Sequence, residues 1–123
     1  MIDALTSFTL VVDQPAIDAY AAITDDFNPL HVDPIFAAAT PMGGVIAHGT
    51  MSLSLIWRSI VESFGPEAAA RATLDVRFLR PVRPGDTVSS GGSPREDNSY
   101  AVWVKNQLGN AVIEGTLAFR DRP

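Results

Sequence analysis

The sequence predicts an α+β fold in which one five-stranded antiparallel sheet curls around a single long helix. Three observations lead to this prediction. Residues 49–64 are apolar on nearly all sides, the chain after residue 71 alternates between apolar and polar residues, and a short apolar run at 7–13 precedes both. With 123 residues, of which 46% are hydrophobic, the chain can bury one core, so we expect a single domain over residues 1–123.

The first part of the chain is expected to form a strand and an amphipathic helix. Residues 7–13 (SFTLVVD) are rich in β-branched and apolar residues, which is typical of a strand. Asp13 can cap a helix over 14–24 (QPAIDAYAAIT), because a proline is tolerated in the first turn. The apolar face of this helix would carry Ile17, Tyr20, Ala21 and Ile23.

Prolines interrupt the next segment, residues 24–34 (TDDFNPLHVDP). Pro29 and Pro34 each disfavour a helical conformation at the residue before them, so we expect this segment to be irregular rather than helical. Residues 34–40 (PIFAAAT) can form one or two helical turns, and PMGG then breaks the pattern.

The central helix is predicted over residues 49–64, a length of roughly 24 Å at the usual rise per residue. It ends at Gly65-Pro66, a helix stop signal. Four strands follow it: RATLDVRFLRPV, then a turn at RPGD into TVSSGGS, then YAVWVKNQ and NAVIEGTLAFR with LGN as a hairpin signal. In the first of these, one face would carry Ala72, Leu74, Val76 and Phe78.

A helix that is apolar all round needs to be buried over most of its surface, and one small sheet cannot cover it completely. Two such sheets that pair edge to edge would cover more of it. We therefore expect a homodimer, or a higher homo-oligomer built from dimers.

Composition and charge limit the classes of function. The net charge of −5 argues against a general nucleic-acid binder. Without a membrane-length apolar run or a secretory leader, we expect a cytoplasmic protein that does not bind membranes. The chain has no cysteine and two histidines, so we expect neither disulfides nor a metal. All nine basic residues follow residue 57; Arg77, Arg80 and Arg83 could meet an anionic ligand, although a solvated strand face explains each of them better.

Residues 26–31 (DFNPLH) hold more groups able to carry protons than a turn requires. By itself, Asp26 before Asn-Pro would be a turn or capping residue. The same segment is followed by AHG at 47–49 and by the buried helix, and this combination indicates a site.

Together, DDFNPLHVDP and VIAHGTMSLSL resemble the MaoC-like, (R)-specific enoyl-CoA hydratase family. Its hydratase motif is matched here by Asp26, Phe27, Asn28, Pro29, Leu30 and His31. Its His-Gly signature is matched by His48 and Gly49, and RFLRPVRPGDTV resembles the strand-turn-strand that follows the helix. The resemblance implies the hot-dog fold, in which a curled sheet wraps one long helix. In many family members a glycine stands at the position of Asp25.

Hydration of a 2-enoyl thioester needs a base, an acid and donors for the thioester oxygen. We assign Asp26 to activating water and His31 to protonating the α-carbon; the reverse assignment, or one water serving both, stays open. Gly49 at the helix start is the expected oxyanion donor, and Asn28 is expected to hold the loop or a carboxylate. His48 is expected to pack at the helix start. The predicted acyl pocket contains Phe36, Met42, Ile56 and Trp57.

The resemblance thus predicts a hydro-lyase that converts trans-2-enoyl-CoA to (R)-3-hydroxyacyl-CoA. It needs no cofactor, since coenzyme A enters as part of the acyl-CoA substrate. An alternative is a 3-hydroxyacyl dehydratase that acts on acyl-carrier-protein or specialised CoA esters with the same residues. A thioesterase, or a non-catalytic acyl-binding subunit on the same scaffold, fits the motif less well.

Overall fold

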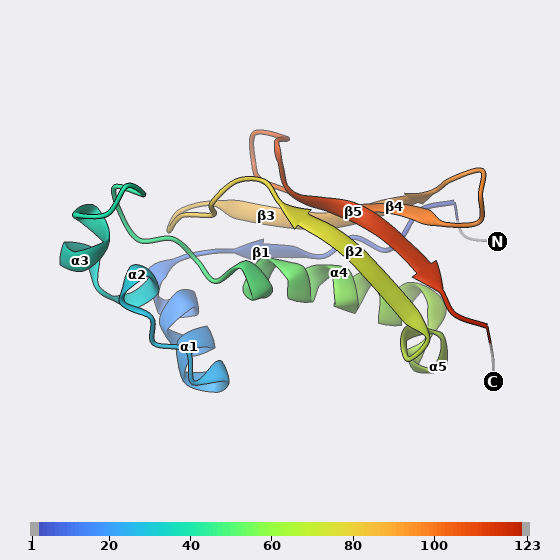
Figure 1. The fold of residues 1–123 in the computed structure, drawn as a ribbon, viewed down its shortest axis with the longest axis horizontal. Helices are drawn as coiled ribbons and strands as arrows, with labels where there is room; N and C mark the ends of the chain where they lie inside the picture. Colours follow the sequence, from blue (N-terminus) through green and yellow to red (C-terminus); the bar gives the residue numbers. More distant parts are fainter. Residues whose placement is uncertain (1–2, 122–123) are drawn as a thin grey trace.

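The computed structural model describes residues 3–121 as one sheet with helices on one of its faces (Figure 1). The strands and helices follow in the order β1 (Thr9–Val11), α1 (Gln14–Thr24), α2 (Pro29–Val32), α3 (Pro34–Ala38), α4 (Gly49–Phe64), α5 (Pro66–Ala69), β2 (Ala72–Phe78), β3 (Thr87–Pro94), β4 (Tyr100–Lys105) and β5 (Ala111–Phe119). The predicted α+β class, with five strands and a central helix, is confirmed.

The five strands form one antiparallel sheet in the order β1-β3-β4-β5-β2. The hairpin β4–β5 turns at Gly109, whose φ of 80° suits glycine, as the LGN signal predicted. β2 pairs with β5 over its whole length, from Ala72 opposite Phe119 to Phe78 opposite Ile113. β1 is shorter than the predicted strand 7–13.

Figure 1 shows α4 lying along one face of the sheet, with α1, α2 and α3 gathered near its N-terminal end and α5 at its other end. Six residues of α4 are buried: Met51, Ser52, Leu55, Ile56, Ser59 and Ile60. The opposite side of α4 is open, since Trp57 and Val61 are 38% and 43% exposed. In a single chain the helix is therefore buried on one side only, and the expected burial over most of its surface is not seen.

Local capping explains where α1 begins and ends. The Asp13 side chain accepts a hydrogen bond from Ala16 N–H at 2.8 Å, as predicted for an N-cap. Ile17 and Ala21 are buried, but the prediction for Ile23 is wrong, because its side chain is 82% exposed. Position 23 lies beyond the edge of the buried stripe, and none of the elements within residues 3–121 covers its side chain.

The segment after α1 is more regular than predicted. Pro29 and Pro34 each occupy the first turn of a short helix, α2 and α3, where a missing N–H has no consequence. Asn28 and Asp33, the residues before these prolines, are not helical, as predicted. α3 lies within the helical turns predicted for 34–40, whereas α2 was not predicted. The one-turn helix α5, after Gly65, was not predicted either. No helix within residues 3–121 has the length and apolar character needed to cross a membrane.

Candidate active site

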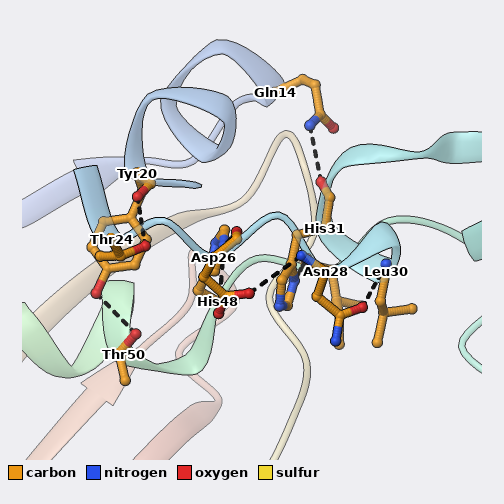
Figure 2. Close-up of polar contacts among 10 residues, drawn as sticks. Gln14, Tyr20, Thr24, Asp26, Asn28, Leu30, His31, His48 and Thr50 are labelled. Carbon is orange, nitrogen blue, oxygen red and sulfur yellow. Dashed lines mark hydrogen bonds and ion pairs between the residues drawn. The ribbon is translucent and has the colours of Figure 1, made fainter. Parts of the chain in front are cut away.

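Three elements bring the predicted chemical groups together at the N-terminal end of α4. Tyr20 comes from α1, His31 from α2, and His48 directly precedes α4, while Asp26 lies in the link between α1 and α2. Figure 2 shows these side chains converging. One carboxylate oxygen of Asp26 and one ring nitrogen from each of His31 and His48 all lie within 4.8 Å of one another.

The backbone around Asp26 is fixed by the end of α1. Asp25 is the C-cap, in the left-handed region with φ of 55°, and the N–H of Asp26 donates to the Ala21 carbonyl at 3.0 Å. This conformation explains why a glycine is suited to position 25, although Asp tolerates it better than most residues. The carboxylate of Asp26 stays 52% exposed, and its Oδ1 accepts the Asn28 N–H at 3.3 Å.

His31 is held by the chain segment that leads into α4. Its Nδ1 lies 2.7 Å from the Ile46 carbonyl, and a carbonyl can only accept, so Nδ1 carries the hydrogen. In the neutral ring the lone pair is therefore on Nε2. The His31 carbonyl in turn accepts from the Gln14 side chain at 3.1 Å, which ties α2 to α1. In the half-buried imidazole, Nδ1 is thus used in a hydrogen bond to the backbone, and Nε2 is the nitrogen left for proton transfer.

Asn28 caps α2. Its Oδ1 accepts the Leu30 N–H at 3.0 Å. This contact fits the predicted role of holding the loop between Asp26 and His31. The alternative role predicted for Asn28, holding a carboxylate, stays a prediction.

His48 is the most buried of the three, at 3% exposure. Its Nε2 lies 2.9 Å from the Asp26 backbone carbonyl and 4.0 Å from Asp26 Oδ2. Its ring stacks on that of His31, with centroids 3.9 Å apart and planes at 28°. His48 therefore contacts both of the residues predicted to carry the chemistry, which sequence reasoning did not anticipate.

Gly49, the first residue of α4, is closely covered by Phe78. A Cβ at position 49 would lie 2.8 Å from Phe78 Cε1, so the ring occupies the space that any side chain would need. The first N–H groups of a helix lack partners within the helix, and α4 is 16 residues long. Gly49 therefore offers a helix N-terminus that carries no side chain of its own.

A cavity of about 330 Å³ begins at this point and is mainly apolar. His48, Gly49, Ser52, Phe78 and Leu79 contribute to its wall, whereas Asp26 and His31 do not. His48 is thus shared between the acid/base groups and the cavity. Phe78 and Leu79 were missed from the sequence, because they lie some 30 positions from the His-Gly signature and nearly 50 from the hydratase motif, and only the fold brings the end of β2 there.

The predicted pocket residues divide into three cases. Met42 lines the cavity, at 41% exposure. Ile56 does not line the cavity. Its side chain is 1% exposed and packs in the hydrophobic core, so the prediction that it lines the pocket is wrong. Phe36 and Trp57, at 49% and 38% exposure, lie outside the cavity wall. A pocket role for these two stays a prediction.

The arrangement of Asp26, His31 and His48 does not fit a metal ion. A ligating imidazole points its nitrogen at the metal from within the ring plane, at about 2 Å. Two rings stacked face to face, as His31 and His48 are, cannot both do so at one ion without rotating. The His48 Nε2 is also already bonded to the Asp26 carbonyl.

The three arginines named from the sequence have separate partners. Arg77 pairs with Glu114 at 3.2 Å on the exposed sheet, as a solvated strand face would. Arg80 donates to the Ala111 carbonyl and Arg83 to the Met42 carbonyl, both at 2.6 Å. Arg80 also lines the cavity, so a positive charge lies at its wall.

Known proteins share both the sequence and the fold. The family described as MaoC like domain matches residues 4–115. The chain is 34% identical to 3-hydroxyacyl-thioester dehydratase Z of Mycobacterium tuberculosis, over 89% of this chain and 70% of that protein. It is 38% identical to Nodulation protein N of Rhizobium meliloti, over 68% of this chain and 55% of that protein. It is 35% identical to the (R)-specific enoyl-CoA hydratase of Aeromonas caviae, over 60% of this chain and 55% of that protein. The chain thus spans about half the length of the last two relatives.

Solved structures give the same picture. The (R)-hydratase from A. caviae superposes with a TM-score of 0.76 at 24% identity, over 98% of this chain and 97% of that one, and this likeness concerns the fold. The R-hydratase from Pseudomonas aeruginosa has a TM-score of 0.75 at 27% identity, over 99% and 83%. The fold is the hot-dog fold of these neighbours. The chain belongs to the MaoC-like dehydratase family.

Proposed function

We propose that this protein reversibly hydrates trans-2-enoyl-CoA to (R)-3-hydroxyacyl-CoA by acid–base catalysis with Asp26 and His31. The observation that carries the proposal is the convergence of these two side chains at the N-terminal end of α4. A carboxylate oxygen of Asp26 and a ring nitrogen of His31 are at most 4.8 Å apart, so one water molecule between the two side chains can hydrogen-bond to both.

The cavity and helix terminus beside this pair suit an acyl thioester. The apolar wall can take the acyl chain, and the N–H of Gly49 is the donor we assign to the thioester oxygen. A helix N-terminus favours negative charge, so it stabilises the enolate-like transition state more than the neutral substrate. The names of two relatives, a thioester dehydratase and an (R)-specific hydratase, support the same reaction class.

In the hydration direction, Asp26 accepts a proton from water while the water oxygen bonds to the β-carbon. Protonated His31 delivers a proton from Nε2 to the α-carbon. Asp26 then holds the extra proton, and its return to His31, directly or through water, restores both groups. One water is added in total. Dehydration follows the same steps in reverse, and a single water held by both side chains would satisfy the same balance.

The test is the loss of conjugated-thioester absorbance when the protein meets crotonyl-CoA, with the product offered to an (R)-specific dehydrogenase. Asp26→Asn should lower kcat about 10²- to 10⁴-fold, the usual contribution of a general acid or base. Asp25→Asn is the matched control, because it makes the same chemical change one residue away and Asn tolerates the left-handed backbone equally well.

Equal activity of the Asp26→Asn variant and the parent protein would contradict the assignment and favour a non-catalytic acyl-binding subunit. Release of free thiol instead of hydration would indicate a thioesterase. Matched substrates on coenzyme A and on acyl carrier protein distinguish the two carriers, since a carrier protein needs a basic docking patch. Faster turnover of the carrier-protein substrate would favour the 3-hydroxyacyl dehydratase alternative over the proposed CoA hydratase.

We infer that the working form is a homodimer. β2 is an edge strand of seven residues, and among the described strands it pairs with β5 alone. Phe78 and Leu79 at its end are 56% and 41% exposed beside the cavity, so a second copy on this edge would cover apolar surface at the site. Light scattering after gel filtration should give about twice the 13.2 kDa of one chain. A mass of one chain at micromolar concentration would contradict the dimer.

A further inference from the structure

We propose that His48 is the positioning residue of this site: its one imidazole holds the backbone of Asp26 and the ring of His31 in their working arrangement. In this assignment His48 does not exchange protons with the substrate. The catalytic part of the inference rests on the proposed function, whereas the contacts that carry it do not. Three observations support it.

The first observation is the hydrogen bond from His48 to the Asp26 main chain. The acceptor is a carbonyl, so Nε2 of His48 must be the donor, at 2.9 Å. The Asp26 N–H is bound to the Ala21 carbonyl at 3.0 Å. The peptide groups on both sides of the Asp26 Cα are therefore anchored, one to α1 and the other to the start of α4. The Asp26 side chain is 52% exposed, and its Oδ2, 4.0 Å from Nε2, stays accessible to a water molecule.

The second observation is the stacking of His48 on His31. The hydrogen bond from His31 Nδ1 to the Ile46 carbonyl fixes the direction in which this ring points. It does not fix rotation of the ring about that hydrogen bond. The His48 ring, 3.9 Å away and tilted by 28°, restricts that rotation. Together the two contacts determine where Nε2 of His31 lies.

The third observation is that the His48 ring is itself held by packing and almost fully buried. Tyr20 meets it edge-on at 5.0 Å, and the Tyr20 hydroxyl donates to Thr50 Oγ1 at 2.8 Å in the first turn of α4 (Figure 2). The His48 Nδ1 is buried and has no hydrogen-bond partner among the described residues. A second N–H there would be unpaired and buried, which is unfavourable, so the geometry assigns the lone pair to Nδ1. Such a ring, with Nε2 bonded to the Asp26 carbonyl and Nδ1 buried, is suited to orienting its neighbours.

Two substitutions separate the two contacts. His48→Gln retains an amide N–H able to reach the Asp26 carbonyl but removes the ring. His48→Phe retains a ring to stack on His31 but removes the donor. Each should lower kcat about 10- to 100-fold with KM changed less than about threefold, the range found when a supporting contact of a functional residue is lost. Turnover at the parent level in both variants would overturn the proposal.

A double-mutant cycle with Asp26 distinguishes positioning from general support of the fold. If His48 acts through Asp26, His48→Phe should have much less effect in an Asp26→Asn background than in the parent protein. If the fold-decrease in kcat of the double variant equals the product of the two single decreases, His48 acts independently of Asp26. That result would overturn this part of the proposal. Circular dichroism and the thermal midpoint confirm that each variant is folded before its rate is used.

A second measurement does not depend on activity or on the variants. Nitrogen-15 spectra of the imidazoles in the unmodified protein, at a pH where both rings are neutral, should show His48 protonated on Nε2 and His31 on Nδ1. Protonation of His48 on Nδ1 would overturn the proposal even if the enzyme is active. Conversely, the predicted tautomers together with no hydration of enoyl thioesters would leave the positioning contacts intact and refute the proposed function.

Discussion

The two ends of α4 each hold three aromatic rings, but they use them differently. At the N-terminal end, Tyr20, His31 and His48 lie with ring centroids 3.9 to 5.0 Å apart in the contacting pairs. At the other end, Phe64, Tyr100 and Phe119 meet edge to face at 4.9 to 6.4 Å, as apolar aromatic rings prefer.

The difference lies in the ring atoms. Each imidazole donates one ring N–H to a backbone carbonyl, so hydrogen bonds specify the orientation of the ring. The second nitrogen is Nε2 in His31, which we assign to proton transfer, and Nδ1 in His48, which is buried. Phe64 and Phe119 have no such groups and are placed by packing alone. We therefore expect the C-terminal ring cluster to contribute mainly to stability and the N-terminal one mainly to turnover.

The largest effect on stability should come from the C-terminal cluster. Phe64→Ala removes the ring that meets both Tyr100 and Phe119, so it should lower the free energy of unfolding by about 2 kcal/mol, less than for a fully buried ring. Activity per folded molecule should not change. Urea unfolding and an enoyl-CoA hydration assay measure the two quantities. A fall in kcat of the folded variant would contradict the division between the two ends.

An intermediate effect, on activity, is expected at Gly49. Gly49→Ala would place a methyl group 2.8 Å from Phe78 Cε1, and the half-exposed ring must move away from the helix terminus. Disturbance of one oxyanion donor should lower kcat about tenfold or more. Gly44→Ala is the matched control, because its new Cβ meets Arg83 Nη1 at an ordinary 3.5 Å.

Phe78→Ala in the Gly49→Ala protein tests the cause of that loss. With the ring gone, the alanine has space, so part of the lost kcat should return. If the double variant is no better than Gly49→Ala alone, the steric explanation fails. The loss would then have to come from the altered helix terminus itself.

The smallest effect should come from the turn between β3 and β4, which adjoins Tyr100 of the C-terminal cluster and belongs to neither set of rings. The Ser99 hydroxyl, together with the Ser99 N–H, holds the pKa of Asp97 below its ordinary value of 3.8. The stabilisation is therefore present above pH 3.8 and disappears as the pH falls through the lowered pKa. Ser99→Ala should raise the pKa of Asp97 and leave turnover unchanged. A carboxyl NMR titration measures it; an unshifted pKa would contradict this assignment of the hydroxyl.

Local signals predicted α1 and α4 well. The Asp13 cap, the apolar stripe of α1 and the Gly65-Pro66 stop depend on neighbours within a few residues, so the sequence contains them in full. The prediction for Ile23 was wrong because exposure of a helix end depends on which element covers it. α2 was missed because a proline at a first helical position resembles a helix breaker in the sequence.

The candidate site divides in the same way. The motif placed Asp26 and His31 five residues apart, and the His-Gly signature marked the start of α4. The sequence did not reveal that His48 stacks on His31, or that Phe78 covers Gly49. These contacts join residues 17 and 29 positions apart in the chain, and only the fold brings them together.

The sequence by itself determined the long helices, the five strands, their order and the residues able to carry protons, because periodicity, caps and side-chain chemistry are local properties. Only the tertiary structure decided which nitrogen of each imidazole is committed and which side chains wall the cavity. Those features follow from the packing of α1, α2 and β2 around the start of α4, and no short stretch of the chain contains that information.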